Sequence, residues 1–202
     1  MLRSRKKKMD WAAWAYAGWL ALAVAGGAIA QSAAPSATPS AKAAAIDIPA
    51  LFGGRVQAVS PRGKAFLTGD FDGDGVADAL YFVRILPKAK GGGLATDVTV
   101  ADPWNQQPVS DAGELLALAI VAGAGGRKYL LHDAAFFSTP IWSAPELPLG
   151  LAKKGSKQFR EFQRAAKGVK GDILVPGTEA GIDIALYWDG KKFTLFWPKE
   201  EP

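Results

Sequence analysis

Residues 69–86 read GDFDGDGVADALYFVRIL, in which a glycine- and aspartate-rich turn leads directly into an apolar, aromatic segment. Glycine and aspartate are typical of turns, whereas aromatic and β-branched side chains favour strands. Residues 64–68 bring further strand-forming side chains up to the start of the turn. This stretch therefore predicts a strand, an acidic loop and a second strand over residues 78–86.

Short strand-like segments separated by turn residues make up most of the remaining chain. Residues 157–167 predict a helix, because Phe159, Phe162 and Ala166 recur at helical spacing. Residues 138–151 contain three prolines and predict an irregular loop. We expect a mainly β fold, with antiparallel strands in a small propeller-like or sandwich arrangement and one α-helix, since both arrangements give this pattern. Further strands are expected at residues 55–60, 94–100, 115–121 (a helix segment being the alternative), 129–132, 172–175, 182–188 and 193–197.

The acidic loop has the composition of a cation site. Its carboxylates stand at loop positions 1, 3, 5 and 9, and a chain wrapped around a hard cation presents alternate side chains to the ion. Gly75, at position 6, permits the sharp turn that such a loop needs. Carboxylates this close would repel one another strongly without a cation. We expect Ca²⁺ to be bound by the carboxylates of Asp70, Asp72, Asp74 and Asp78 and by the carbonyl of Val76.

The surroundings of the loop distinguish it from an EF-hand. An EF-hand would place a glutamate at position 12, where this chain has Tyr81 inside the expected strand. The pattern instead resembles the calcium loops of FG-GAP and VCBS-type repeats, strand-loop-strand units of integrin-like β-propellers, with the motif Asp-x-Asp/Asn-x-Asp-Gly-x-x-Asp. The resemblance covers one loop, residues 69–82, and implies a calcium-stabilised strand-loop-strand unit. A complete seven-bladed propeller does not fit into the about 157 residues after residue 45.

Composition excludes several kinds of chemistry. The chain has no Cys and one His, so disulfides, thiolate nucleophiles, cysteine-bound zinc and multi-histidine metal sites are excluded within one chain. The 24 Lys and Arg outnumber the 19 Asp and Glu, but 5 of the basic residues and 1 acidic residue lie in residues 1–30. The rest of the chain is nearly neutral, and we therefore expect no nucleic-acid partner.

The N-terminal segment predicts export. A basic start at residues 3–8 precedes an uncharged run at residues 11–30, which ends in Ala28-Ile29-Ala30. Small residues at that place are typical of signal-peptidase sites, so we expect residues 1–30 to be a signal peptide. The alternative is a retained membrane anchor, because about 20 apolar residues can span a bilayer. Residues 31–45 are Ala-, Ser- and Pro-rich and predict a flexible linker before a domain at residues 46–202.

Three other features have a structural and a functional interpretation. His132, Asp133 and Ser138 suggest a nucleophilic triad, but no Gly-x-Ser-x-Gly turn is present, so we expect no enzyme and interpret His132 as a strand-end residue. The basic run at residues 153–170 is either a solvated helix face or a docking surface for an acidic partner. Trp142 is either packed or part of a protruding contact.

These observations lead to two hypotheses of function. The first is an exported, calcium-binding β module, periplasmic or secreted, that acts by binding a protein or cell-envelope partner and contacts a membrane only through an uncleaved N-terminal segment. The second is a periplasmic inhibitor or immunity protein that blocks a lysozyme-like, cell-wall-degrading enzyme. The second hypothesis rests on similar organisation, with an export signal, a β fold and an aspartate loop, and assigns no residue roles.

Overall fold

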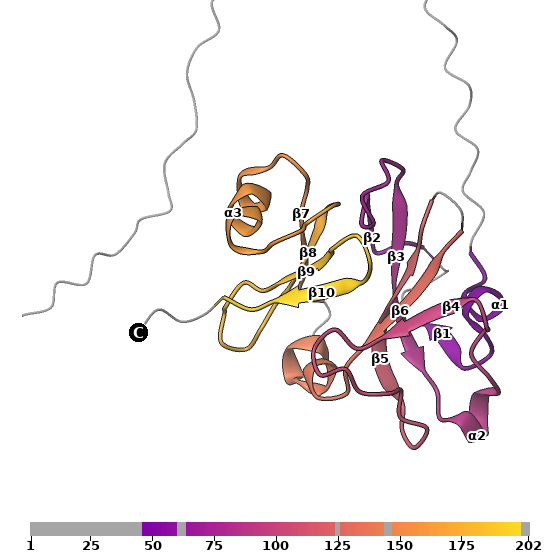
Figure 1. Ribbon diagram of the computed structural model, residues 1–202. Coiled ribbons are helices and arrows are strands. Elements are labelled where there is room, and N and C mark those ends of the chain that lie inside the picture. The colour runs from indigo at the N-terminus through magenta and orange to yellow at the C-terminus, as the bar shows by residue number, and fades with distance from the viewer. Residues whose placement is uncertain (1–45, 60–63, 124–125, 144–146, 199–202) are drawn as a thin grey trace, which may run out of the picture. The chain divides into compact units, whose positions relative to one another are not determined.

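The computed structural model describes residues 46–59, 64–123, 126–143 and 147–198 (Figure 1). The expected signal peptide at residues 1–30 and the expected linker at residues 31–45 lie outside the described residues. Within the described ranges, two β-sheets and a few short helices form the domain.

The first sheet has six strands, in the order β1-β3-β5-β6-β4, with β2 also paired to β3. All of its pairs are antiparallel except β4 with β6, which are parallel. The long strand β3 lies between β5 on one side and β1 and β2 on the other. The short helices α1 (Ile48–Phe52) and α2 (Lys88–Gly91) precede β1 and follow β3. The strands are β1 (Val56–Ala58), β2 (Leu67–Gly69), β3 (Asp78–Ile85), β4 (Val98–Ala101), β5 (Leu115–Val121) and β6 (Lys128–His132).

Strand β3 has apolar side chains on both faces, because each face packs into a different core. Leu80 and Phe82 belong to a cluster that also contains residues of the second sheet. Tyr81, Val83 and Ile85 point the other way and pack with α1. A strand buried on both sides reads as a nearly continuous apolar run, as this segment does.

The second sheet has four antiparallel strands in the order β10-β9-β8-β7. Helix α3 (Lys157–Ala165) begins at Ser156, whose hydroxyl accepts a hydrogen bond from the Phe159 amide at 3.1 Å. Its buried Phe159 and Phe162 share a cluster with β8 and β9. The strands are β7 (Leu149–Ala152), β8 (Ile173–Pro176), β9 (Ala185–Trp188) and β10 (Phe193–Phe196).

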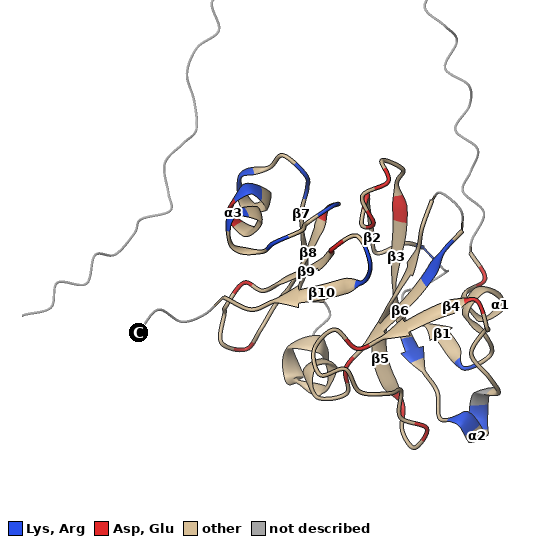
Figure 2. Cartoon of the chain, viewed as in Figure 1, with Lys and Arg blue, Asp and Glu red and all other residues tan. Residues whose placement is uncertain are grey.

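Helix α3 carries several basic residues, which are blue in Figure 2. Lys157, Arg160 and Arg164 are exposed, whereas Phe159 and Phe162 are buried. Burial of one stripe is sufficient to fix the helix, so the cationic face is left to solvent.

The prediction of a mainly β fold is confirmed. The described residues form two sheets and no closed barrel or propeller. The loop predicted at residues 138–151 is only partly irregular: it contains a 3₁₀ turn at Pro140–Ser143 and ends in strand β7, and Trp142 is buried in the core. The prediction missed β7, α1 and α2 because four- and five-residue elements are too short to show a periodicity.

Candidate metal site

The acidic loop, residues 70–77, connects β2 to β3. Antiparallel pairing brings Gly69 opposite Asp78, so the loop closes on the ends of two paired strands. Gly73 and Gly75 have positive φ angles of 77° and 88°, which glycine adopts without steric cost. The strands therefore fix both ends of the loop, and the glycines let its acidic residues turn inward.

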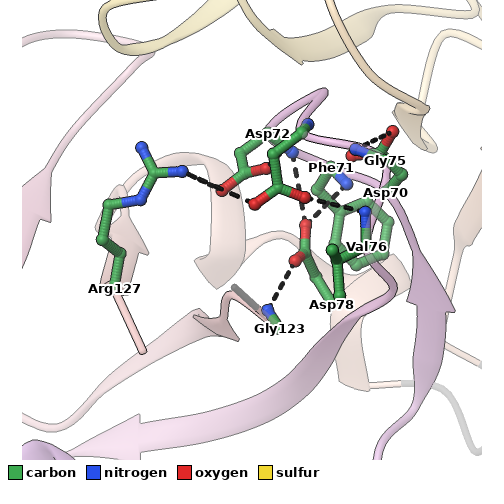
Figure 3. A network of polar contacts seen from close by, with 9 residues as sticks. Asp70, Phe71, Asp72, Gly75, Val76, Asp78, Gly123 and Arg127 are labelled. Atoms are coloured by element: carbon green, nitrogen blue, oxygen red, sulfur yellow. Dashed lines mark hydrogen bonds and ion pairs between the residues drawn. The ribbon is translucent and has the colours of Figure 1, made fainter. Parts of the chain in front are cut away.

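Asp78 holds the backbone of the loop in place (Figure 3). Its carboxylate accepts hydrogen bonds from the amides of Phe71 (2.7 Å), Asp72 (3.3 Å) and Gly123 (2.9 Å). The residue is only 1% exposed. Because Gly123 follows β5, the Asp78 carboxylate connects the acidic loop to the turn between β5 and β6.

Asp70 and Asp72 place their carboxylates beside that of Asp78. Asp70 Oδ2 accepts from the Gly75 amide at 3.1 Å, whereas its Oδ1 is buried without a hydrogen-bond partner among the described residues. Asp72 Oδ1 accepts from the Asp74 amide at 3.2 Å. One ligand oxygen from each of Asp70, Asp72 and Asp78 lies within 4.8 Å of the other two, so the three residues could hold a metal ion.

Asp74 and Val76, the other two predicted ligands, lie at the exposed rim of the loop. The Asp74 carboxylate accepts from the Val76 amide at 2.8 Å and is not part of the three-carboxylate group. Val76 is 44% exposed. The structure thus brings together three of the four predicted carboxylates and places Asp74 and Val76 beside them.

Arg127 is a member of the site that the sequence did not indicate. Its guanidinium donates to Asp72 Oδ2 at 2.7 Å and lies 3.8 Å from Asp74 Oδ2. It comes from the turn between β5 and β6, 55 residues further along the chain than Asp72. Half of its side chain is exposed, so it covers the loop from the solvent side.

A second connection fixes the loop to the other sheet. Asp172, next to β8, accepts from the amides of Asp70 (3.2 Å) and Lys154 (2.7 Å), and its own amide donates to the Asp70 carbonyl at 2.6 Å. A Cβ at Gly171 would lie 2.2 Å from that carbonyl oxygen, so only glycine permits this approach. The candidate site is therefore held by both sheets.

Burial makes the negative charge of the site costly. It raises the pKa of Asp72, with further increases from Asp78 and Asp74 that Arg127 opposes. It also raises the pKa of Asp78, although backbone amides counteract the shift. The negative charge of this cluster and the unpaired Asp70 Oδ1 favour a cation, and oxygen ligands suit hard cations best.

The second feature singled out in the sequence, His132, lies at the end of β6 as expected. The Ser138 hydroxyl donates to the Ala135 carbonyl at 2.9 Å, and Asp133 accepts from the Asn105 side chain and the Phe136 amide. No hydrogen bond among the described residues joins His132, Asp133 and Ser138 into a triad. His132 is 3% exposed and lines an open cavity of about 830 Å³.

His132 should make the stability of the protein depend on pH. Burial lowers its pKa below the ordinary 6.5, and the nearby Asp102 and Asp133 oppose that shift. A folded-state pKa below the unfolded value gives stability that is complete above about pH 6.5 and is lost as pH falls through the folded-state pKa. We expect urea unfolding at pH 7.5 and 5.5 to show a smaller loss of stability for His132→Gln than for the unmodified protein. Parallel losses in the two proteins would contradict this origin.

Comparison with models of protein families, with curated proteins and with solved structures gave no significant match to this chain. No helix in the described ranges has the length and apolar character needed to cross a bilayer.

Proposed function

We propose that this protein is an exported, non-catalytic binding module in which Ca²⁺ makes one strand-loop-strand unit rigid. The observation that supports the proposal is the convergence of the Asp70, Asp72 and Asp78 carboxylates, with a buried Asp70 oxygen that has no partner among the described residues. The proposed ligands also include Asp74 and the Val76 carbonyl at the rim of the same loop.

Calcium suits this loop better than magnesium does. Ca²⁺ accepts six to eight oxygens in flexible geometry, whereas Mg²⁺ demands a near-ideal octahedron. Several oxygens here already accept backbone hydrogen bonds, so the ligand geometry is set by the loop rather than by the ion. A cation that accepts irregular coordination geometry, as Ca²⁺ does, fits ligands whose positions the loop has already fixed.

The proposed location is the periplasm or the cell exterior, and the proposed partner is a protein or a cell-envelope component. The location is supported by the basic and apolar N-terminal sequence. Calcium modules outside the cell typically bind with dissociation constants of about 10⁻⁴ to 10⁻³ M, which ambient calcium can fill. A structural role for the ion is consistent with that affinity.

Thermal unfolding tests the calcium site. With about 10 mM Ca²⁺ and such an affinity, linkage should raise the midpoint by about 3 to 10 °C relative to excess EDTA. Asp70→Asn should abolish most of this increase, because it removes charge where an oxygen lacks a partner. The matched control is Asp183→Asn at an exposed position, which should respond like the unmodified protein. Identical midpoints in EDTA and Ca²⁺ would reject the calcium assignment.

A further inference from the structure

A recess separate from the acidic loop surrounds residues 102–109, between two sheet edges. Its largest hollow, about 830 Å³, is lined by β4, by residues 102–109, by His132 and by β10. Strands β4 and β10 are each the last strand of their sheet. The volume lies within the about 300 to 1,000 Å³ of typical small-molecule sites.

Two smaller hollows extend this recess. One, of about 370 Å³, shares Asp102, Gln107 and His132 with the largest. The other, of about 380 Å³, shares Asn105 and Asp133 with the second hollow. Because these hollows have lining residues in common, they form one continuous recess.

The loop that forms the floor of the recess is held rigidly. The Asp102 carboxylate accepts from the amides of Trp104 (2.9 Å), Asn105 (2.9 Å) and Gln107 (3.0 Å). Gln106 has a φ of 57°, a conformation that is unfavourable for a residue with a side chain and that concentrates at functional sites. These internal hydrogen bonds therefore preorganise the loop.

The polar groups that remain free suit a neutral, hydroxyl-rich ligand. None of the side-chain hydrogen bonds among the described residues uses the His132 imidazole or the Gln106 amide, and both residues line the recess. A neutral imidazole and a carboxamide each offer donors and acceptors, as hydroxyl groups require. The Asp102 and Asp133 carboxylates flank His132 but are occupied by amide donors, so they repel anions without being free to bind cations.

The third hollow of the recess is aromatic. Trp104 stacks on Phe136 with ring centroids 4.8 Å apart, and both line the third hollow together with Trp197. Trp197 is 48% exposed, and the buried Nε1 of Trp104 has no hydrogen-bond partner among the described residues. Flat aromatic faces beside amide groups match a pyranose ring, which has an apolar C–H face and a hydroxyl edge.

We propose that this recess binds a short neutral oligosaccharide, with Gln106 and His132 facing its hydroxyl groups and Trp104 and Trp197 contacting its ring faces. The inference rests on the proposed binding role and names the chemistry of the partner, but it uses no residue of the acidic loop. Failure of the calcium site and failure of this site are therefore separable.

Titration calorimetry of the full chain with cellotriose, maltotriose and tri-N-acetylchitotriose tests the proposal, in EDTA and again with Ca²⁺. At least one trisaccharide should bind, and Gln106→Ala and Trp197→Ala should each weaken that binding by about tenfold or more. Both side chains are exposed, so these variants should fold. Gln158→Ala on α3, outside the recess, is the matched control and should bind as the unmodified protein does.

Two results would overturn the proposal. One is the absence of binding for all three trisaccharides up to about 10 mM, the weak limit of a specific site. The other is binding that Gln106→Ala, Trp197→Ala and the Gln158→Ala control all leave unchanged. Saccharide binding in EDTA with no calcium effect on unfolding would support this site while rejecting the calcium assignment.

Discussion

Asp78→Ala is expected to lower the free energy of unfolding by about 3 to 5 kcal/mol, even with excess EDTA. The carboxylate of Asp78 is almost fully buried and accepts from three backbone amides. Alanine would leave these donors without a partner, and two of them belong to the buried residues Phe71 and Asp72. The loss is the desolvation cost of the three amides, and it requires no metal ion.

Urea unfolding in EDTA measures this loss, with Asp183→Ala as the control. Asp183 is exposed, so its substitution should change the free energy of unfolding by less than about 0.5 kcal/mol. If Asp78→Ala unfolds like the unmodified protein in EDTA and differs only when Ca²⁺ is present, then Asp78 is an ion ligand and not the residue that fixes the loop. Loss of the secondary-structure signal before urea is added would agree with the prediction.

The acidic loop and its strands could be predicted because their determinants are local. The four aspartates lie within nine consecutive positions, from Asp70 to Asp78. Strand β3 could be recognised by its apolar run, which the fold needs because the strand packs into two cores. The helix α3 was likewise predicted from the spacing of Phe159 and Phe162, which pack on the second sheet. In each case the pattern of apolar residues in the sequence directly marks the side chains that the fold buries.

The partners of the loop could not be predicted, because they are distant along the chain. Arg127 reaches Asp72 only because β5 pairs with β3 and the turn from β5 to β6 lies near the start of β3. Asp172 reaches Asp70 although 102 positions separate them in the sequence. For the same reason, the proximity of His132 to Asp133 and Ser138 in the sequence did not indicate which groups surround it in the fold. The structure places Asp102, from the loop after β4, beside His132, because parallel pairing aligns β4 with β6.

Arg127 should compete with Ca²⁺ for the acidic loop, so that its removal destabilises the protein without the ion and has little effect on stability with it. Its guanidinium is 2.7 Å from Asp72 Oδ2, whose side chain is 1% exposed. Without metal, Arg127→Gln leaves that buried charge unpaired. Because half of the Arg127 side chain is in solvent, we expect a loss of about 1 to 2 kcal/mol rather than that of a fully buried pair.

With Ca²⁺ the same substitution should tighten ion binding by about tenfold, since a positive charge no longer opposes the incoming cation. That gain is worth about 1.4 kcal/mol at saturation and offsets most of the loss. The difference between Arg127→Gln and the unmodified protein should therefore be large in EDTA and nearly vanish in Ca²⁺. Urea unfolding in both conditions measures it, with Arg84→Gln as the control, because Arg84 is as exposed and pairs with Glu114 at 3.5 Å far along β3. A difference that is equal in both conditions would mean that Arg127 and Ca²⁺ do not share the carboxylates of this loop.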